Sequence, residues 1–233
     1  MNPRDFLDLM FSPLTFFQRK TAAPPRILAA LLIVILVAAL YFITFSRLVS
    51  SIVAVPMAHL ENSQSFQVLR ILELSQPISK LVVFFASLQF PFTWGMGALY
   101  VVAVCTLIEI DLRFSKILEL FGQSFLPFAV FLTFAFVAVT FYLPQADTSG
   151  FSAAHDNETF LSATEDYMAD IRLSPLMITI GVLHYAFVGW VFLLWAAALR
   201  AAAKLSVPKA GLIVGSWGAI VTVFNVLANR YVR

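Results

Sequence analysis

Long stretches without a charged residue alternate with short charged segments along this chain, and the charge-free stretches define the predicted elements. The first lies between Arg26 and Arg47, and thirteen of residues 27–45 are Leu, Ile, Val or Phe. A membrane-spanning helix needs about 20 predominantly apolar residues. At roughly −0.3 to −0.6 kcal/mol each, these side chains favour insertion into a bilayer. The stretch therefore predicts a first span over residues 27–46.

Further charge-free stretches predict four more spans. The second stretch, interrupted by Pro91, Gly95 and Gly97, is longer than a span needs. We therefore expect the membrane segment at 91–109, with residues 78–89 as a kinked extension or an interfacial helix. Ser174-Pro175 opens another stretch as an N-cap followed by a proline at the first helical position. The predicted spans are 27–46, 91–109, 120–143, 174–199 and 210–229.

Residues 1–25 are predicted to form an amphipathic cytoplasmic tail before this membrane domain, which comprises residues 26–233. Asn2-Pro3 and Ser12-Pro13 each match the start of a short helix. Such helices can lie flat on the membrane with Arg19 and Lys20 at the headgroups, or they can pack under the bundle. The segment 65–74 allows the same two interpretations. The apolar residues of the tail helices are Phe6, Leu9, Met10, Leu14 and Phe17.

Composition supports lipid as the surrounding solvent. Apolar residues make up 61% of the 233 residues and charged residues only 12%, against a usual charged fraction of about 25%. The fold class expected is therefore an all-α integral membrane protein, a five-span transmembrane helical bundle with amphipathic N-terminal interfacial helices. The net charge of +2 is too small to indicate nucleic-acid binding. No signal peptide of the cleaved type is expected, so the first apolar run remains as a span.

Orientation follows from the basic residues in the segments between spans, because Lys and Arg are enriched on the cytoplasmic side. With five spans, nine basic residues share a side with the N-terminus and six lie on the other side. The segment 144–172, with one Arg and six acidic residues, is an acidic outer loop in this layout. We expect a cytoplasmic N-terminus, an external C-terminus, and a solvated headgroup cluster formed by Glu109, Asp111, Arg113 and Lys116.

A stripe of small and polar residues follows one face of the predicted fifth span. In lipid, small residues let helix backbones approach closely, and polar side chains bond across the contact. The stripe is interpreted as a packing seam within the bundle, with a homo-oligomer or a membrane-protein partner as the alternative and a polar permeation path as a third. Its members recur every three or four residues: Gly211, Gly215, Gly218, Thr222, Asn225 and Asn229.

His184 and Tyr185 lie inside the predicted fourth span. An ionisable residue at membrane depth is by default a functional hypothesis, such as a proton relay or a ligand contact. No acidic residue lies in a predicted span core to pair with the histidine, so a neutral His184 hydrogen-bonded inside the bundle is the preferred interpretation. The functional alternative is a transporter or channel component in which both residues, with Thr222 and Asn225, line a polar path.

Motifs for catalysis and cofactor binding are missing from the sequence. It contains no Walker A loop, no H-E-x-x-H zinc motif and no G-x-S-x-G nucleophile elbow. Cys105 is the single cysteine, so no disulfide forms within the chain. A non-enzymatic protein without a cofactor or a bound metal is therefore expected.

Two stretches resemble bacterial members of the Yip-domain family. The segment Phe11-Ser12-Pro13-Leu14-Thr15-Phe16-Phe17 before the first span is similar to the Pro-x-x-Phe-Phe-like element that opens them. The stretch Trp94–Pro127, with Phe114-Ser115 in a short charged loop and Pro127 near the start of a span, is similar too.

The resemblance implies five spans and a cytoplasmic N-terminus. Eukaryotic members are adaptors in vesicle traffic that bind Rab-type GTPases, and they carry a longer soluble region and an Asp-Leu-Tyr-Gly-Pro motif that this sequence lacks. A membrane scaffold or adaptor in a bacterial inner membrane is therefore expected, with the lipid bilayer and a membrane-protein partner or a second copy as its contacts.

Overall fold

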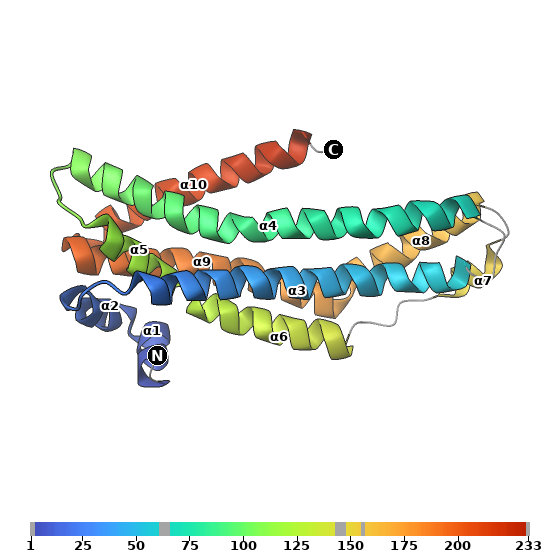
Figure 1. The fold of residues 1–233 in the computed structure, drawn as a ribbon, viewed down its shortest axis with the longest axis horizontal. Helices are drawn as coiled ribbons and strands as arrows, with labels where there is room; N and C mark the ends of the chain where they lie inside the picture. Colours follow the sequence, from blue (N-terminus) through green and yellow to red (C-terminus); the bar gives the residue numbers. More distant parts are fainter. Residues whose placement is uncertain (1–2, 61–65, 143–147, 155–156, 232–233) are drawn as a thin grey trace. The chain divides into compact units, whose positions relative to one another are not determined.

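A computed structural model describes residues 3–60, 66–142, 148–154 and 157–231, and these ranges contain ten α-helices and no strand (Figure 1). Five segments are long and apolar enough to cross a membrane: Ile27–Ala58, Glu73–Leu107, Phe114–Phe141, Pro175–Ala203 and Val207–Phe224. The predicted all-α fold with five spans is therefore confirmed. The helices are α1 (Pro3–Phe11), α2 (Pro13–Ala22), α3 (Ile27–Leu60), α4 (Phe66–Leu107), α5 (Phe114–Gln123), α6 (Leu126–Tyr142), α7 (Ser149–Ala153), α8 (Asn157–Leu173), α9 (Pro175–Ala203) and α10 (Val207–Tyr231).

The second span is longer than predicted, because α4 continues without interruption through Pro77 and Pro91. Residues 78–89, expected as a kinked extension or an interfacial helix, therefore continue the same helix as the membrane segment expected at 91–109. A proline removes one backbone donor, and the remaining hydrogen bonds keep such a helix intact in lipid. The helix ends where the Ile110 N–H donates to the Cys105 carbonyl at 2.8 Å and Glu109 adopts a φ of 62°. This is a Schellman C-cap.

The third span is two helices rather than one. Its first part, α5, ends at Gln123, and α6 begins at Leu126 after a turn at Ser124 and Phe125. Pro127 occupies the first turn of α6, where its missing N–H would have had no partner within the helix. The span predicted over 120–143 therefore consists of the end of α5, a turn and α6.

The chain forms two compact units. The first consists of Met1–Ala38, Gln89–Val130 and Ala186–Arg233, and the second of Ala39–Leu88 and Phe131–Tyr185.

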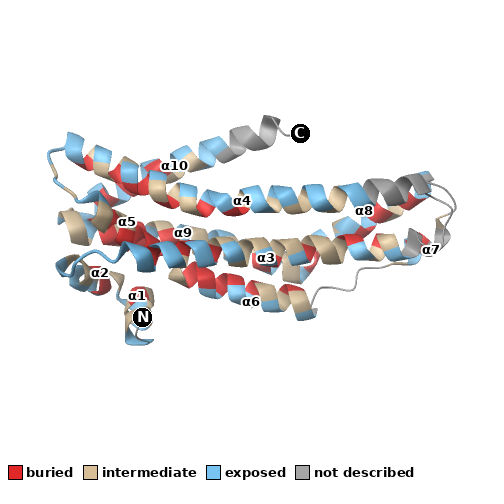
Figure 2. Cartoon of the chain, viewed as in Figure 1, coloured by how far each residue is buried: buried red, intermediate tan, exposed pale blue. Residues whose placement is uncertain are grey.

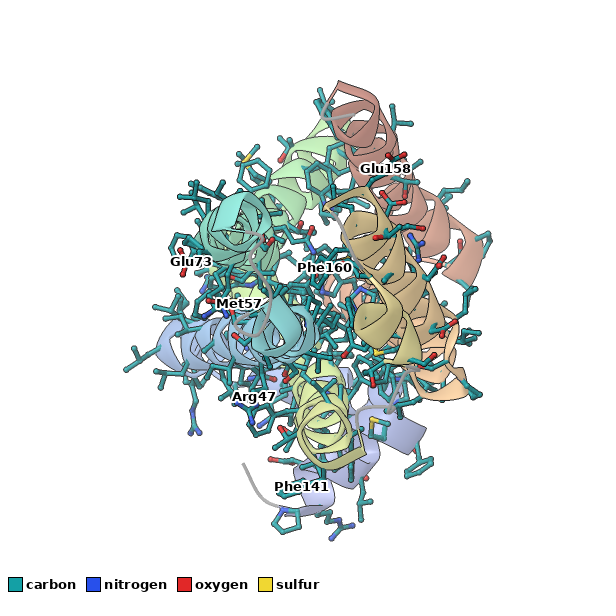
Figure 3. All side chains as sticks on the ribbon, turned by 90° about the vertical axis from the view of Figure 1, so that its right-hand side faces the viewer. Arg47, Met57, Glu73, Phe141, Glu158 and Phe160 are labelled. Atoms are coloured by element: carbon teal, nitrogen blue, oxygen red, sulfur yellow. The ribbon has the colours of Figure 1, made fainter. Side chains whose placement is uncertain are left out.

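The second unit contains a small apolar core in which α7 and α8 pack against the second half of α3. Buried side chains of α8 lie on one face, where Phe160, Tyr167 and Ile171 pack with Val53 and Phe151. Burial raises the pKa of the Tyr167 phenol above its usual value. Figure 3 shows Phe160 inside this unit near Met57, whereas Glu158 lies on its outside.

The predicted outer loop at 144–172 therefore contains two helices, α7 and α8, within its described part. The acidic residues of α8 are exposed on the face opposite the core: Glu158, Glu165, Asp166 and Asp170. The loop prediction missed the apolar residues that recur every three or four positions between them, which is the period of an amphipathic helix.

Candidate functional site

The most continuous buried stretch of the first unit is the end of α5 and the turn into α6. Every residue from 119 to 125 is buried (Figure 2), although Glu119, Gln123 and Ser124 are polar. Buried polar groups in such a place must be hydrogen-bonded. The partners that they find define the candidate site.

Two tryptophans of neighbouring helices donate hydrogen bonds to carbonyl groups of α5. The Trp94 Nε1–H of α4 donates to the Leu118 carbonyl at 2.7 Å, and the Trp195 Nε1–H of α9 donates to the Phe121 carbonyl at 3.1 Å. The Trp195 ring also stacks on the Phe121 ring, with 4.2 Å between centroids. These contacts allow α5 to end inside an apolar environment.

Two glycines bring helices of the first unit into close contact with their neighbours. A methyl group placed on Gly122 would lie 2.6 Å from the Ala30 Cβ of α3, and one on Gly97 would lie 2.6 Å from the Trp195 ring. Both distances are far inside van der Waals contact, so each position requires glycine. Neither glycine belongs to the predicted seam.

Lys116, Glu119 and Gln123 form a polar network on one face of α5. The Lys116 ammonium donates to Glu119 Oε2 at 2.8 Å, and the Gln123 amide donates to Glu119 Oε1 at 3.1 Å. The Glu119 side chain is only 2% exposed and that of Lys116 only 12%. Lys116 is therefore enclosed, which corrects its predicted place in a solvated headgroup cluster.

The same lysine connects this network to the N-terminal tail. Its ammonium donates a second hydrogen bond, of 2.8 Å, to the Ala23 carbonyl directly after α2. A cation at a helix C-terminus is favoured by the helix dipole. Phe16 and Phe17 of α2 and Leu9 of α1 are fully buried. Of the two interpretations left open for the tail, the burial of Leu9 and Phe17 agrees with helices packed against protein.

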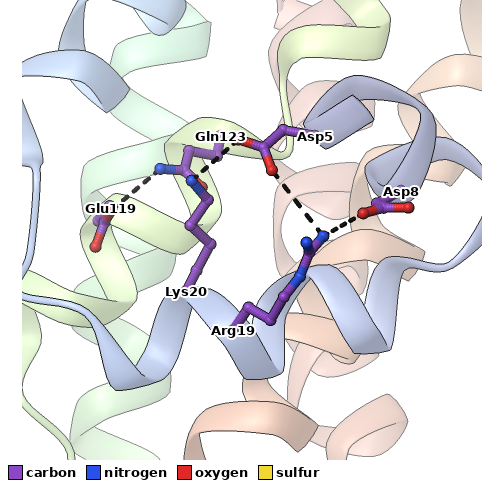
Figure 4. Close-up of polar contacts among 6 residues, drawn as sticks. All are labelled: Asp5, Asp8, Arg19, Lys20, Glu119 and Gln123. Carbon is purple, nitrogen blue, oxygen red and sulfur yellow. Dashed lines mark hydrogen bonds and ion pairs between the residues drawn. The ribbon is translucent and has the colours of Figure 1, made fainter. Parts of the chain in front are cut away.

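Ion pairs hold the two tail helices together. Figure 4 shows Arg19 of α2 reaching Asp8 and Asp5 of α1, and Lys20 lying 3.5 Å from Asp5. These basic groups contact carboxylates of their own chain, in contrast to the predicted contact with lipid headgroups. Each exposed pair contributes about 0–1 kcal/mol. The pairs set the geometry of the tail more than its stability.

The predicted seam on α10 lies mostly open. Gly211, Gly215 and Thr222 are exposed, and a methyl group on either glycine would meet no atom within 4 Å. Gly218 alone has a neighbour, with Phe192 at 3.7 Å. The Asn225 backbone is helical, and its side chain, like that of Asn229, lies outside the described residues. Among the described residues, the structure places no neighbour against Gly211 or Gly215, and the role of the seam stays a prediction.

The two residues of the predicted intramembrane pair differ in exposure, although their ring centroids lie 5.5 Å apart. His184 is partly buried, with its ring centroid 6.2 Å from that of Tyr41 and 6.3 Å from that of Phe131. Tyr185 is 77% exposed. The Thr222 hydroxyl donates to the Gly218 carbonyl of its own helix at 2.8 Å. A polar lining built from these residues stays a prediction.

Sequence reasoning missed Glu119 and Gln123, which lie at the edge of a predicted span. The signal was the spacing of three and four residues from Lys116 to Glu119 to Gln123, which puts all three on one helix face. Their groups bond to one another and to the tail. The site therefore holds the N-terminal helices against the third span.

A chain with five long apolar helices, a broken third span and a packed N-terminal helix pair is a multi-pass integral membrane protein. The family model of the Yip1 domain matches residues 7–228, nearly the whole chain. The protein therefore belongs to the Yip1 domain family, and the resemblance seen in the sequence is confirmed. No curated protein and no solved structure matches the chain.

Proposed function

We propose that this protein is a non-enzymatic scaffold of a bacterial inner membrane, which holds a membrane-protein partner or a second copy against the small-residue face of α10. This face consists of Gly211, Gly215, Gly218 and Thr222. The observation that carries the proposal is that no other described part of the chain comes within 4 Å of a methyl group added to Gly211 or Gly215.

The opposite face of α10 supports this interpretation. Ala210, Ile213, Val214 and Trp217 are buried, and Ser216 shares a 2.7 Å hydrogen bond with Tyr100 of α4. The first unit therefore already uses one side of α10 for its own packing. Lipid tails solvate exposed leucines and phenylalanines well, so a small-residue face in lipid gains most from another helix that can approach its backbone.

The test is co-purification from detergent-solubilised membranes after Gly215→Leu and Gly211→Leu. Each leucine would occupy the space of an approaching helix, so we expect at least a tenfold loss of the co-purifying protein or of the self-associated form. Both positions are exposed, and an added Cβ meets no neighbouring element among the described residues, so folding is expected to be unchanged.

Gly189→Leu is the matched control, since Gly189 is exposed in α9 and likewise has no atom within 4 Å of an added methyl group. It should leave association unchanged. Equal recovery from all three variants, with each folded, would remove the α10 face from the proposal.

A further inference from the structure

The N-terminal helix α1 exposes two large apolar side chains on one face. Leu7 is 55% exposed and Phe11 is 80% exposed, and the two lie one helical turn apart. Leu9, on the opposite side of this short helix, is fully buried. The side of α1 that points away from the protein is therefore apolar, although α1 lies outside the membrane-spanning segments.

The connection to the first span limits where this face can be. The chain leaves α2 at Ala22 and enters α3 at Ile27, and the four residues between them can reach at most roughly 14 Å. The bond from Lys116 to the Ala23 carbonyl anchors the same point to α5, the first part of the third span. The helix pair α1–α2 is therefore held close to the surface of the bilayer.

The contacts of the tail also hold the orientation of α1. Asp5 and Asp8 pair with Lys20 and Arg19 of α2, and Phe16 and Phe17 secure α2 by burial. Leu7 and Phe11 are thus presented outward by a packed helix pair. Because the helix pair is already ordered, its apolar face enters the membrane–water interface without a large cost in conformational entropy.

The charge of the N-terminal segment indicates which lipid headgroups the Leu7–Phe11 face of α1 contacts. Residues 3–26 contain four basic and two acidic side chains, and exposed Arg4 lies on the same helix face as Leu7 and Phe11. Basic residues beside an apolar helix face attract anionic headgroups. At the start of α3, Leu28 and Leu32 are also exposed.

We propose that α1 docks on the membrane–water interface through Leu7 and Phe11, and that anionic lipid headgroups are its partner. The helix face involved differs from the one predicted from sequence, because Leu9 and Phe17 are used for packing inside the protein. This inference is independent of the scaffold function proposed for α10.

The test uses the full chain in lipid nanodiscs with Cys105→Ala, which removes the single native thiol. An environment-sensitive fluorophore is attached to Leu7→Cys, to Phe11→Cys and, as a matched control, to Gln18→Cys on the exposed surface of α2. We expect blue-shifted emission, quenching by lipids spin-labelled near the headgroup and several-fold protection from aqueous iodide at positions 7 and 11 only. The protection should increase when phosphatidylglycerol replaces part of the phosphatidylcholine.

A second measurement needs no substitution. Photoactivatable phospholipid should form adducts on residues 3–11 of the native chain. Full iodide access at both positions, or the absence of lipid adducts, would overturn the proposal. A third outcome would also overturn the proposal. If positions 7 and 11 are protected from iodide and form crosslinks to another polypeptide, but are not quenched by lipid, a protein covers this face.

Discussion

Gly97 shows how closely the first unit is packed around a single residue. An added Cβ would lie 2.6 Å from the Trp195 ring and 2.8 Å from Trp217 Nε1, two bulky groups with little freedom to move. Gly95, two residues earlier on the same helix, has no atom within 4 Å of the same position. Alanine substitutions at the two glycines therefore form a matched pair of variants, one at a packed position and one at an open position.

Gly97→Ala is predicted to lower the free energy of unfolding by about 1–3 kcal/mol, the usual cost of overpacking. Gly95→Ala is predicted to raise it by up to about 1 kcal/mol, because alanine favours a helix over glycine. The measurement is thermal unfolding in detergent, followed by a thiol-reactive dye on Cys105, which is fully buried.

The prediction requires the unfolding midpoint of Gly97→Ala to lie below that of Gly95→Ala. Equal midpoints for the two variants would show that α4, α9 and α10 are not in close contact at Gly97.

At the scale of elements, α5 is the helix on which the tail depends. Its Lys116–Glu119 pair is nearly buried, so removing one partner leaves a charge without compensation. Such a change typically costs about 3–5 kcal/mol, whereas replacing both partners with apolar groups is often close to neutral.

Lys116→Met is therefore predicted to destabilise the protein by about 3–5 kcal/mol and to release α2, because the bond to the Ala23 carbonyl is lost as well. Limited proteolysis should then cut the segment before Ile27 several-fold faster. The double variant Lys116→Met with Glu119→Met should recover much of the stability.

The double variant still lacks the bond to the Ala23 carbonyl, so the tail should remain sensitive to protease. Lys209→Met, at an exposed lysine of α10, is the control and should change neither quantity. Full recovery of tail protection in the double variant would show that Lys116 does not hold the tail.

The break between α5 and α6 illustrates why element boundaries in this protein are hard to predict. Residues 120–143 carry no charge, and a run of this length reads as one helix. The indole N–H groups of Trp94 and Trp195, which donate to carbonyls of α5, come from residues that lie far away in the sequence. Local patterns contain no information about such partners.

At the scale of the whole molecule, an odd number of spans places the two ends of the chain on opposite sides of the membrane. The five candidate segments and the uneven distribution of basic residues predict a cytoplasmic N-terminus and an external C-terminus.

Cysteine labelling in the Cys105→Ala background tests this layout. A membrane-impermeant maleimide should label a cysteine appended to the C-terminus in intact spheroplasts, and label Gln18→Cys only after lysis. Labelling of both positions under the same condition would contradict five crossings.

The sequence alone determined the fold class, the number of spans and the starts of α1 and α2. These features depend on quantities that add up residue by residue along the chain. They are the cost of placing each side chain in lipid and the preference of proline for the first turn of a helix. The family resemblance rested on the same local stretches.

The tertiary structure alone decided which small and polar residues are used inside the protein. The glycines with periodic spacing, Gly211 and Gly215, are open, whereas the irregularly placed Gly97 and Gly122 are tightly packed. Lys116 contacts a carbonyl 93 positions away, and Gly97 contacts a ring on another helix. Packing depends on the partner that folding brings to each residue, and a one-dimensional pattern specifies a helix face without specifying what covers it.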